Sequence, residues 1–382
     1  MDRRAHRAAA LNDSNFVAGI AGREDPPMQY GICVASRPAD IDYVVEAERL
    51  GYTHLWAADS QMIWSDVYAF MALAASRTTT MMIGTGVAVA PIRPAPVTAA
   101  AHATINEIAP GRVFCAIGTG NTAMRIMGHP PMRIAEFDRY LSDLRSFLDG
   151  AEVDYEFRGR IAPTRHLMPD AGFARFDPRI PLHVSAFGPK AMALAARHGD
   201  GLVTSLPPDP DAVAHARRRL ETAAAEVGRT ITNESFPIST LTTAFVLHEG
   251  ESLDSQRVRN GTAAFAIASL HYTYEQVTQF NKRPPAHLAD MWDDYVAHVE
   301  RTPPERRHLT VHRGHNCWLE PDEEQFVTAD LIDRTCLVGT PQQLRSRIAD
   351  LEAAGLNQVI LLPPLDAKEA VIVDVARVLI AD

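Results

Sequence analysis

Cysteine is scarce in this chain, and its four cysteines form no CxxC pair. They stand apart at Cys33, Cys115, Cys317 and Cys336. A chain of 382 residues can bury a core that needs no disulfide bonds for its stability. Isolated cysteines in such a chain are typical of a reducing compartment, so we expect a cytoplasmic protein.

Two further absences restrict the partners. The sequence has no run of about 18 apolar residues, so we expect no membrane-spanning helix and no membrane partner. It has 37 Lys and Arg residues against 47 Asp and Glu residues, a net charge of −10. This balance argues against a nucleic-acid partner, because such binding depends on a basic surface.

The N-terminal segment MDRRAHRAAALNDSNFVAGIAGREDPP lacks the continuous apolar core of a signal peptide. We interpret residues 1–27 as an N-terminal extension that packs loosely. An arm that wraps around another subunit is the alternative. Residues 28–382 are then expected to form one domain.

What the sequence does contain is a repeated pattern of short apolar strand followed by amphipathic helix. Helices are expected between the strands, for example at 39–50, 96–108, 134–148, 189–197 and 209–227, with a last one at 367–380. Eight such units predict an α/β fold, a (β/α)₈ TIM barrel. An open doubly wound sheet is the rival, but the first strand–helix turn lacks its GxGxxG fingerprint. The predicted strands are 30–35, 54–58, 81–90, 112–118, 181–186, 201–205, 241–247 and 358–363.

Two segments interrupt the pattern and are interpreted as insertions. Residues 151–179 indicate an irregular excursion or a hairpin before the fifth strand. Residues 249–333 are longer and mixed, with two tryptophans and many histidines. Insertions of this size between late barrel strands usually cover the active site or contact another subunit. We expect substrate specificity to reside in these two segments.

The most informative stretch runs from residue 81 to residue 128. Its two strand-like runs each carry a Gly-Thr-Gly, at 84–86 and 118–120, and a helical segment separates them. Strand, helix and strand with short connections are typical of a parallel sheet. Glycines at the end of a parallel strand allow a flat ligand or a phosphate to approach the backbone. This segment is therefore expected to face a cofactor.

Four stretches resemble the bacterial luciferase-like superfamily of flavin and deazaflavin oxidoreductases. The resemblance implies a TIM-type barrel, in agreement with the strand count. The AIGTG loop is most similar to the methylenetetrahydromethanopterin reductase branch, which uses a deazaflavin coenzyme as a hydride carrier. Many similar bacterial sequences are thought to use reduced FMN with dioxygen. The stretches are AERLGYTHLWAADS, GRVFCAIGTG, HVSAFGPKAMALAARHGDGLVTS and CLVGTPQQLRSRIADLEAAGLNQVILLPP.

The resemblance also implies where the cofactor binds. The strand at 84–89 would pass under one face of the ring, near a non-prolyl cis peptide or bulge found in relatives, although strand glycines also serve packing alone. The loop after the fourth strand would contact the ring edge or the ribityl chain. A helix start at Pro189 would hold the cofactor's tail through free amides, and a helix start with nothing bound is the alternative. The predicted cofactor residues are Asp59, Gly86, Val87, Ala88, Gly118, Thr119, Gly120, Asn121, Ala186, Phe187, Gly188, Pro189, Lys190, Thr204 and Ser205.

Asp59 and Trp64 match a D-H-x-x-x-W pattern of the deazaflavin-dependent sugar-phosphate dehydrogenases. Ser60 replaces the histidine of that pattern, which removes a candidate acid–base group and argues against sugar-phosphate oxidation. Asp59 can equally be a turn or helix cap, and Trp64 can serve packing. Trp64 and Arg93 are predicted to contact substrate, with capping or surface exposure as the alternative for Arg93.

His312 and His315, in HRGHNCW, are the candidates for catalysis from the second insertion. An imidazole titrates near neutral pH, which suits proton transfer or substrate binding. Their spacing also suits a metal, but no nearby Cys/His pair or HExxH completes a site. We therefore predict no metal, and most of the 15 histidines are expected to be structural.

These patterns predict a flavin-dependent oxidoreductase that acts on a small organic substrate. We expect a two-component monooxygenase, in which FMN reduced by a separate flavin reductase reacts with dioxygen. Deazaflavin-dependent hydride transfer by a reductase or dehydrogenase is the alternative, and a non-catalytic flavin-binding protein is a third. The resemblance further implies a homodimer.

Overall fold

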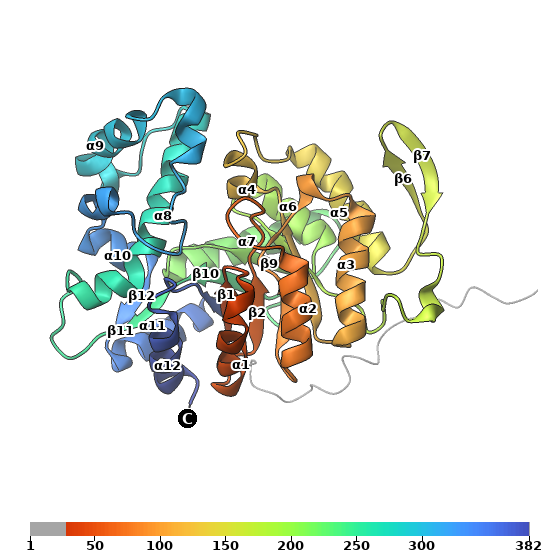
Figure 1. Cartoon of the computed structure of the whole chain (residues 1–382), viewed down its shortest axis with the longest axis horizontal. Coiled ribbons are helices and arrows are strands. Elements are labelled where there is room, and N and C mark those ends of the chain that lie inside the picture. Colours follow the sequence, from red (N-terminus) through yellow and green to blue (C-terminus); the bar gives the residue numbers. More distant parts are fainter. Residues whose placement is uncertain (1–27, 382) are drawn as a thin grey trace, which may run out of the picture.

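Eight parallel strands close into a barrel in the computed structural model, which describes residues 28–381 (Figure 1). The hydrogen-bonded order is β3-β2-β1-β13-β10-β9-β8-β5, and β3 pairs with β5 to close the ring. The predicted (β/α)₈ barrel is thus confirmed, whereas the predicted extension at 1–27 lies outside the described residues. The barrel strands are β1 (Gln29–Val34), β2 (His54–Ala57), β3 (Met82–Thr85), β5 (Val113–Gly118), β8 (Leu182–Ser185), β9 (Gly201–Thr204), β10 (Ile238–Thr242) and β13 (Gln358–Leu361).

An outer layer of helices covers the barrel, and neighbouring helices contact one another around it. In α5 the buried residues Phe137, Leu141, Leu144 and Leu148 recur every three or four positions, which gives the helix one apolar face. That face packs on the strands and leaves the polar face in solvent. The helices of this layer are α1 (Ile41–Arg49), α2 (Val67–Arg77), α3 (Ala95–Ile108), α5 (Ile134–Leu148), α6 (Pro189–His198), α7 (Pro210–Glu226), α11 (Pro341–Ala353) and α12 (Lys368–Leu379).

Large side chains fill the interior of the barrel. The Trp56 and Phe114 rings pack edge to face with centroids 4.6 Å apart. Trp56 Nε1 donates a hydrogen bond to Gln358 Oε1 at 3.0 Å. Burial lowers the pKa of His183 to about 4 and that of His54 to about 3, so both imidazoles are neutral at neutral pH. Because the interior is packed, a ligand has to bind at an end of the barrel.

Two predicted strands are divided in the structure. The run at 81–90 becomes β3 and a separate β4 (Ala88–Val89), with a cis peptide bond between Gly86 and Val87. The run at 241–247 was wrongly assigned to one barrel strand. It forms the end of β10 and then β11 (Ala244–Val246), which leaves the barrel and pairs with β12 (Leu337–Gly339). A second partner strand explains the misassignment, because it gives the apolar residues after β10 another place to be buried.

Both predicted insertions are present as distinct structures. The first forms an antiparallel hairpin of β6 (Val153–Phe157) and β7 (Arg160–Thr164), which projects from the helical layer (Figure 1). The second contains α8 (Gln256–Phe280), α9 (Ala289–Glu300) and α10 (Ala329–Thr335). The remaining short helices are α4 (Asn121–Arg125), η1 (Pro38–Asp40), η2 (Ala90–Ile92), η3 (Pro169–Ala171), η4 (Ala286–Leu288), η5 (Pro304–Leu309) and η6 (Pro321–Phe326).

The second insertion has a small core of its own. Tyr295 is fully buried, and its ring lies edge to face with Phe326 at a centroid distance of 5.1 Å. Ser255 caps the start of α8 by accepting a hydrogen bond from the Val258 amide.

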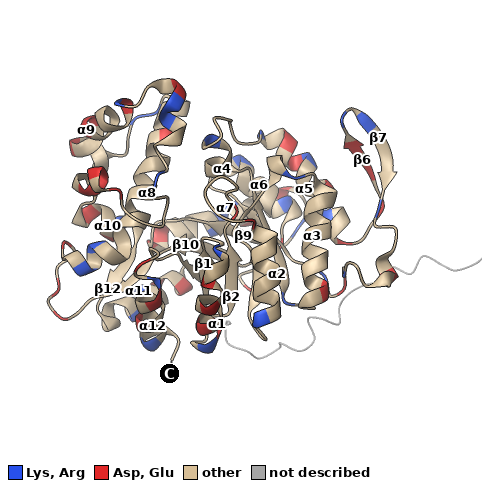
Figure 2. Ribbon diagram, in the orientation of Figure 1, with Lys and Arg blue, Asp and Glu red and all other residues tan. Residues whose placement is uncertain are grey.

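Acidic and basic residues are interspersed over the second insertion and the barrel helices in the view of Figure 2. Among the described residues, no helix is long and apolar enough to cross a membrane.

Candidate active site at the carboxyl end of the barrel

The two predicted glycine segments meet at the carboxyl end of the barrel. Strand β4 pairs with β5, with Val89 opposite Gly118. A methyl group on Gly118 would lie 3.1 Å from Ser185 Cβ and 3.2 Å from Val87 Cγ2. The ends of β5 and β8 and the start of β4 therefore surround one point, and no side chain of residue 118 occupies it.

Gly86 is held between β3 and the end of β2. Its amide donates a hydrogen bond to the Ala57 carbonyl at 2.5 Å. The peptide bond that follows it is the non-prolyl cis bond implied by the resemblance. A methyl group on Gly86 would lie 2.6 Å from Trp56 Cβ, so only glycine fits here without displacing β2.

The second Gly-Thr-Gly leads directly into α4. Gly120 has a φ of +79° at the N-cap of this helix, a conformation that favours glycine. The Asn121 side-chain oxygen accepts a hydrogen bond from Arg125 Nε at 2.9 Å. Arg125 also pairs with Glu275 of α8 at 3.3 Å. Asn121 is thus oriented by a residue that joins the barrel to the second insertion.

The third predicted segment forms the exposed start of α6. Phe187, Gly188, Pro189 and Lys190 are all exposed, and no side chain caps the helix. The first-turn amides after Pro189 are therefore open to an anion from outside the helix. Ala186, by contrast, is buried, and its amide bonds to the Val203 carbonyl at 3.2 Å.

The two hydroxyls predicted at the end of β9 differ in availability. Thr204 is 2% exposed, and its hydroxyl has no hydrogen-bond partner among the described residues. The Ser205 hydroxyl donates to the Leu241 carbonyl at 2.9 Å. A buried hydroxyl without a partner is costly, so Thr204 fits a position that a ligand or a water completes.

Asp59 and Arg93 bind each other. Arg93 Nη1 lies 2.5 Å from Asp59 Oδ2, and the same oxygen accepts the Val89 amide at 3.1 Å. The Arg93 guanidinium also lies over the Tyr68 ring at 4.9 Å. Burial raises the pKa of Asp59 above its ordinary value, although the Arg93 charge opposes that shift. The two opposite charges largely cancel, and the ion pair lies beside Val89 of β4.

Trp64 joins the barrel to the second insertion. Its indole Nε1 contacts Cys317 Sγ at 3.4 Å, and its ring lies 5.6 Å from the His315 ring. The predicted substrate residue Trp64 and the predicted catalytic residue His315 are therefore neighbours, although they lie far apart in the sequence. This contact places the segment HRGHNCW against the loop that follows β2.

His312 and His315 are both buried. Burial lowers the pKa of His315 well below its ordinary value, and the neighbouring His312 lowers it further. Burial also lowers the pKa of His312, although the Glu275 carboxylate, 2.9 Å from its Nε2, opposes the shift. Both imidazoles are neutral at neutral pH, and the lowered pKa makes each a weaker proton acceptor than a free imidazole.

Three residues of this site were missed in the sequence, and all lie on α8: His271, Tyr272 and Glu275. The Tyr272 hydroxyl accepts a hydrogen bond from Thr122 at 2.8 Å and lies 3.5 Å from His315 Nε2. The segment HYTYE contained a usable signal, because His271 and Glu275 are four positions apart and share one helix face.

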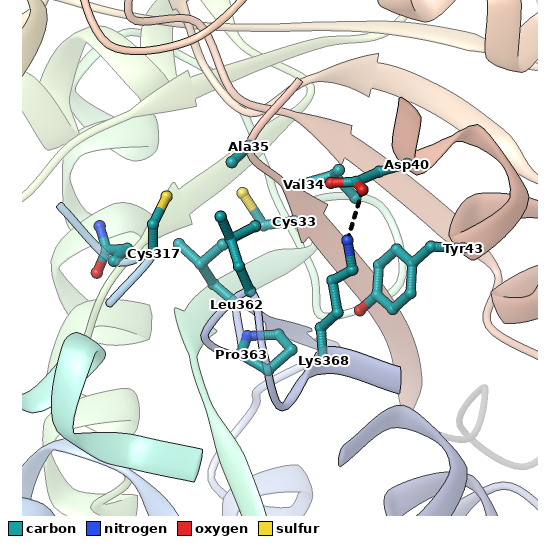
Figure 3. Close-up of a pocket in the computed structure, with 11 residues that line it drawn as sticks. Cys33, Val34, Ala35, Asp40, Tyr43, Cys317, Leu362, Pro363 and Lys368 are labelled. Atoms are coloured by element: carbon teal, nitrogen blue, oxygen red, sulfur yellow. Dashed lines mark ion pairs between the residues drawn. The ribbon is translucent and has the colours of Figure 1, made fainter. Parts of the chain in front are cut away.

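A small pocket lies beside the ends of β1 and β13. Its volume is about 10 Å³, enough for about one water molecule. Figure 3 shows Lys368 extending along the Tyr43 ring to Asp40, and its Nζ lies 2.7 Å from Asp40 Oδ1. The residues that line the pocket are Cys33, Val34, Ala35, Asp40, Tyr43, Asn316, Cys317, Leu362, Pro363, Leu365 and Lys368.

The Asp40–Lys368 pair predicts a pH-dependent contribution to stability. Burial alone would raise the pKa of Asp40, but hydrogen bonds from Arg37 and Lys368 lower it overall. The stabilisation is therefore present above the unfolded pKa, near 4, and is lost as the pH falls through the folded pKa. We expect Asp40→Asn to lower the free energy of unfolding by about 2 kcal/mol at pH 7, with a smaller loss at acidic pH.

Urea unfolding between neutral and acidic pH measures this difference. Asp42→Asn, two residues further along in α1, is the matched control, because the Asp42 side chain is 84% exposed and its ion pair with Arg77 is on the surface. Equal pH dependence of the wild type and Asp40→Asn would show that the pair contributes nothing.

Comparison with known proteins places this architecture in a family. The family model described as luciferase-like monooxygenase matches residues 22–358. The chain belongs to this luciferase-like family. Its members include oxidoreductases that use flavins and others that use deazaflavins, so membership alone does not fix the reaction.

The relatives similar in sequence are named as reductases and dehydrogenases, and several of the names include dependence on F420. The chain is 26% identical over 342 residues to a 5,10-methylenetetrahydromethanopterin reductase of Archaeoglobus fulgidus, covering 86% of this chain and 91% of the reductase. It is 30% identical over 179 residues to an F420-dependent glucose-6-phosphate dehydrogenase of Beutenbergia cavernae, covering 42% of this chain and 50% of that enzyme.

Solved structures confirm the fold and include both chemistries. The coenzyme F420-dependent tetrahydromethanopterin reductase of Methanopyrus kandleri superimposes with a TM-score of 0.68 at 19% identity, covering 93% of this chain and 99% of that one. The oxygenating component of 3,6-diketocamphane monooxygenase from Pseudomonas putida, in complex with FMN, superimposes with a TM-score of 0.60 at 16% identity. This superposition covers 93% of this chain and 98% of that one. At these identities the likeness establishes the fold alone.

Proposed function

We propose that this protein transfers a hydride between a deazaflavin coenzyme and a small organic substrate, as a reductase or dehydrogenase. The observation that carries the proposal is the similarity to a methylenetetrahydromethanopterin reductase over 86% of this chain. This reverses the order expected from the sequence, where FMN-dependent oxygenation came first. The oxygenases enter the comparison through structures of lower identity.

Features of the carboxyl end fit a flat cofactor with an anionic tail. Gly118 leaves backbone without a side chain beside Val87 and Ser185. The open amides at the start of α6 suit a phosphate. The unpartnered hydroxyl of Thr204 suits a polar group of the ligand. When bound there, the coenzyme supplies a two-electron hydride carrier.

The proposed substrate side lies between the barrel and the second insertion. Trp64 and the Asp59–Arg93 pair come from the barrel loops, and His315 and Tyr272 come from the insertion. In this arrangement the insertion excludes water from the reacting atoms. We assign substrate contact to Trp64 and Arg93, and the catalytic contact from the insertion to His315 with His312 as its neighbour.

The second candidate is the two-component monooxygenase that uses reduced FMN and dioxygen. It is favoured by the superposition on the 3,6-diketocamphane monooxygenase component in complex with FMN. A non-catalytic flavin-binding protein is the third. These candidates differ in which cofactor binds and in whether binding leads to turnover.

Titrating the purified protein with FMN and with the deazaflavin coenzyme, with binding measured by fluorescence quenching, distinguishes the three candidate functions. We expect micromolar binding of the deazaflavin and weaker binding of FMN. Reduction of the coenzyme by a panel of small alcohols, or its oxidation by small unsaturated acceptors, would then show hydride transfer. Tight binding of FMN alone would overturn the proposal, and binding of either cofactor without turnover would favour the binding protein.

Thr204→Val tests the assigned position of the cofactor. Loss of the hydroxyl is expected to weaken deazaflavin binding about tenfold without lowering stability, because the hydroxyl has no protein partner. Thr222→Val on α7 is the control, since the exposed Thr222 hydroxyl bonds to the Arg218 carbonyl of its own helix. Unchanged affinity in Thr204→Val would remove Thr204 from the site.

A further inference from the structure

Three buried histidines gather where the second insertion meets the barrel. His271 comes from α8, and His312 and His315 come from the segment that contacts Trp64. Their exposures are 1%, 6% and 4%. If one ring nitrogen is taken from each imidazole, the three nitrogens all lie within 4.8 Å of one another. The fold thus brings a third histidine to the pair that appeared incomplete in the sequence.

Each imidazole is held from outside the cluster through its Nε2 atom. His271 Nε2 lies 2.8 Å from Glu323 Oε1, and His312 Nε2 lies 2.9 Å from Glu275 Oε1. Both carboxylates are largely buried, with side chains 7% and 11% exposed. A histidine that donates Nε2–H to a carboxylate keeps Nδ1 as a lone-pair donor, which is the usual arrangement around a metal ligand.

Two of the inner nitrogens have the spacing of ligands to a single ion. The Nδ1 atoms of His312 and His315 are 3.3 Å apart. Two nitrogens bound to tetrahedral Zn²⁺ at about 2.05 Å each are roughly 3.3 Å from one another. His271 Nδ1 is buried and has no hydrogen-bond partner among the described residues.

A purely structural hydrogen-bond network explains this cluster less well. A hydrogen bond between His312 and His315 would satisfy two of the inner nitrogens and leave His271 Nδ1 without a partner. The Asn316 side-chain nitrogen Nδ2 lies 3.2 Å from His315 Nε2. Ligation by His315 through Nδ1 requires this amide to turn, so that its oxygen accepts the Nε2 proton.

We propose that His271, His312 and His315 bind one divalent transition metal ion, with Zn²⁺ the best match, through their Nδ1 atoms. Three imidazoles leave a fourth position for water. The ion would tie α8 to the segment beside Trp64 and so fix the insertion against the barrel mouth. His312 and His315 would then be ligands of the ion. The metal site stands whether or not a deazaflavin binds.

Metal analysis of the full chain tests the site. The protein is stripped with a chelator, incubated with Zn²⁺ or Co²⁺, passed through gel filtration and measured by elemental analysis. We expect one ion per chain, a visible Co²⁺ spectrum of tetrahedral intensity, and a higher melting temperature with Zn²⁺. His271→Ala should lower Zn²⁺ affinity at least 100-fold, and Glu323→Gln, which leaves all three ligands in place, about tenfold.

His198→Ala is the matched control, because His198 Nε2 also bonds a carboxylate, Asp138 at 2.6 Å, but lies outside the cluster. This variant should keep one ion per chain. Circular dichroism verifies that each variant is folded, and Glu323→Gln carries the test if His271→Ala is not. Absence of retained Zn²⁺ in the wild type, or full retention in folded His271→Ala and Glu323→Gln, would overturn the proposal.

Discussion

Gly86→Ala is expected to lower the free energy of unfolding by about 3 kcal/mol or more, the upper part of the range for overpacking. The added methyl would lie 2.6 Å from Trp56 Cβ and 2.9 Å from the Trp56 carbonyl carbon. These atoms cannot move away, because Trp56 is 1% exposed and is fixed by Phe114 and Gln358. The clash therefore displaces β2 or β3 instead of a flexible side chain. Urea unfolding measures the loss.

Gly188→Ala is the control for stability, since a methyl group there meets nothing within 4 Å. Its stability should match the wild type. Any folded fraction of Gly86→Ala should bind the deazaflavin at least tenfold more weakly, because the segment before Val87 has moved. A Gly86→Ala variant as stable as the wild type would show that this part of β3 yields readily and is not a rigid support for a cofactor.

The fold could be predicted from the sequence because its signals are local. Each barrel unit repeats an apolar strand and an amphipathic helix, as in β5 followed by α5. The predicted helix at 134–148 agrees with α5 at both ends. The end of β10 was less predictable, because an apolar run does not reveal which strand it will pair with. The partner of β11 is β12, which lies about 90 positions further along the chain.

The backbone geometry at the carboxyl end was predictable for a similar reason. Glycines at strand ends and a proline at a helix start are local features whose geometry follows from residue type. The structure brings Val87, which follows Gly86, next to Gly118 and leaves the start of α6 uncapped by a side chain. The sequence could not predict which polar side chains already form hydrogen bonds within the protein. Ser205 and Asn121 bond to the protein itself, whereas Thr204 does not.

The insertion side was the least predictable part. His312 and His315 stood out by their spacing, but their partners His271 and Glu275 lie on a helix that starts many residues earlier. Only the packing of α8 against the segment at 312–315 brings the four together. The spacing of His312 and His315 alone predicts no metal, because no further ligand stands near them in the chain, whereas the fold supplies His271 from α8.

Asp59→Ala is expected to lower the free energy of unfolding by about 3–5 kcal/mol, the range for removing one partner of a buried ion pair. The Arg93 guanidinium, whose side chain is 17% exposed, would lose its partner at 2.5 Å. The other acid near it, Asp66, lies 3.7 Å away and is 60% exposed. The Val89 amide would also lose its acceptor. Substituting both Asp59 and Arg93 with uncharged residues should cost less than the sum of the two single changes.

Arg93→Met adds a pH dependence whose sign follows from the burial of Asp59. The pKa of this carboxyl is already raised by burial, and loss of the guanidinium raises it further. The folded variant then binds a proton that the unfolded chain releases, so its stability falls as the pH rises from about 4, the unfolded pKa, toward neutral. Unfolding curves at pH 5 and pH 8 should show a larger defect at pH 8. The exposed pair of Arg77 and Asp42 is the control, where Arg77→Met should cost less than about 1 kcal/mol at either pH. If the loss in free energy of unfolding in Arg93→Met did not depend on pH, Asp59 would have found another partner. The structure around Asp59 and Val89 would then not depend on this ion pair.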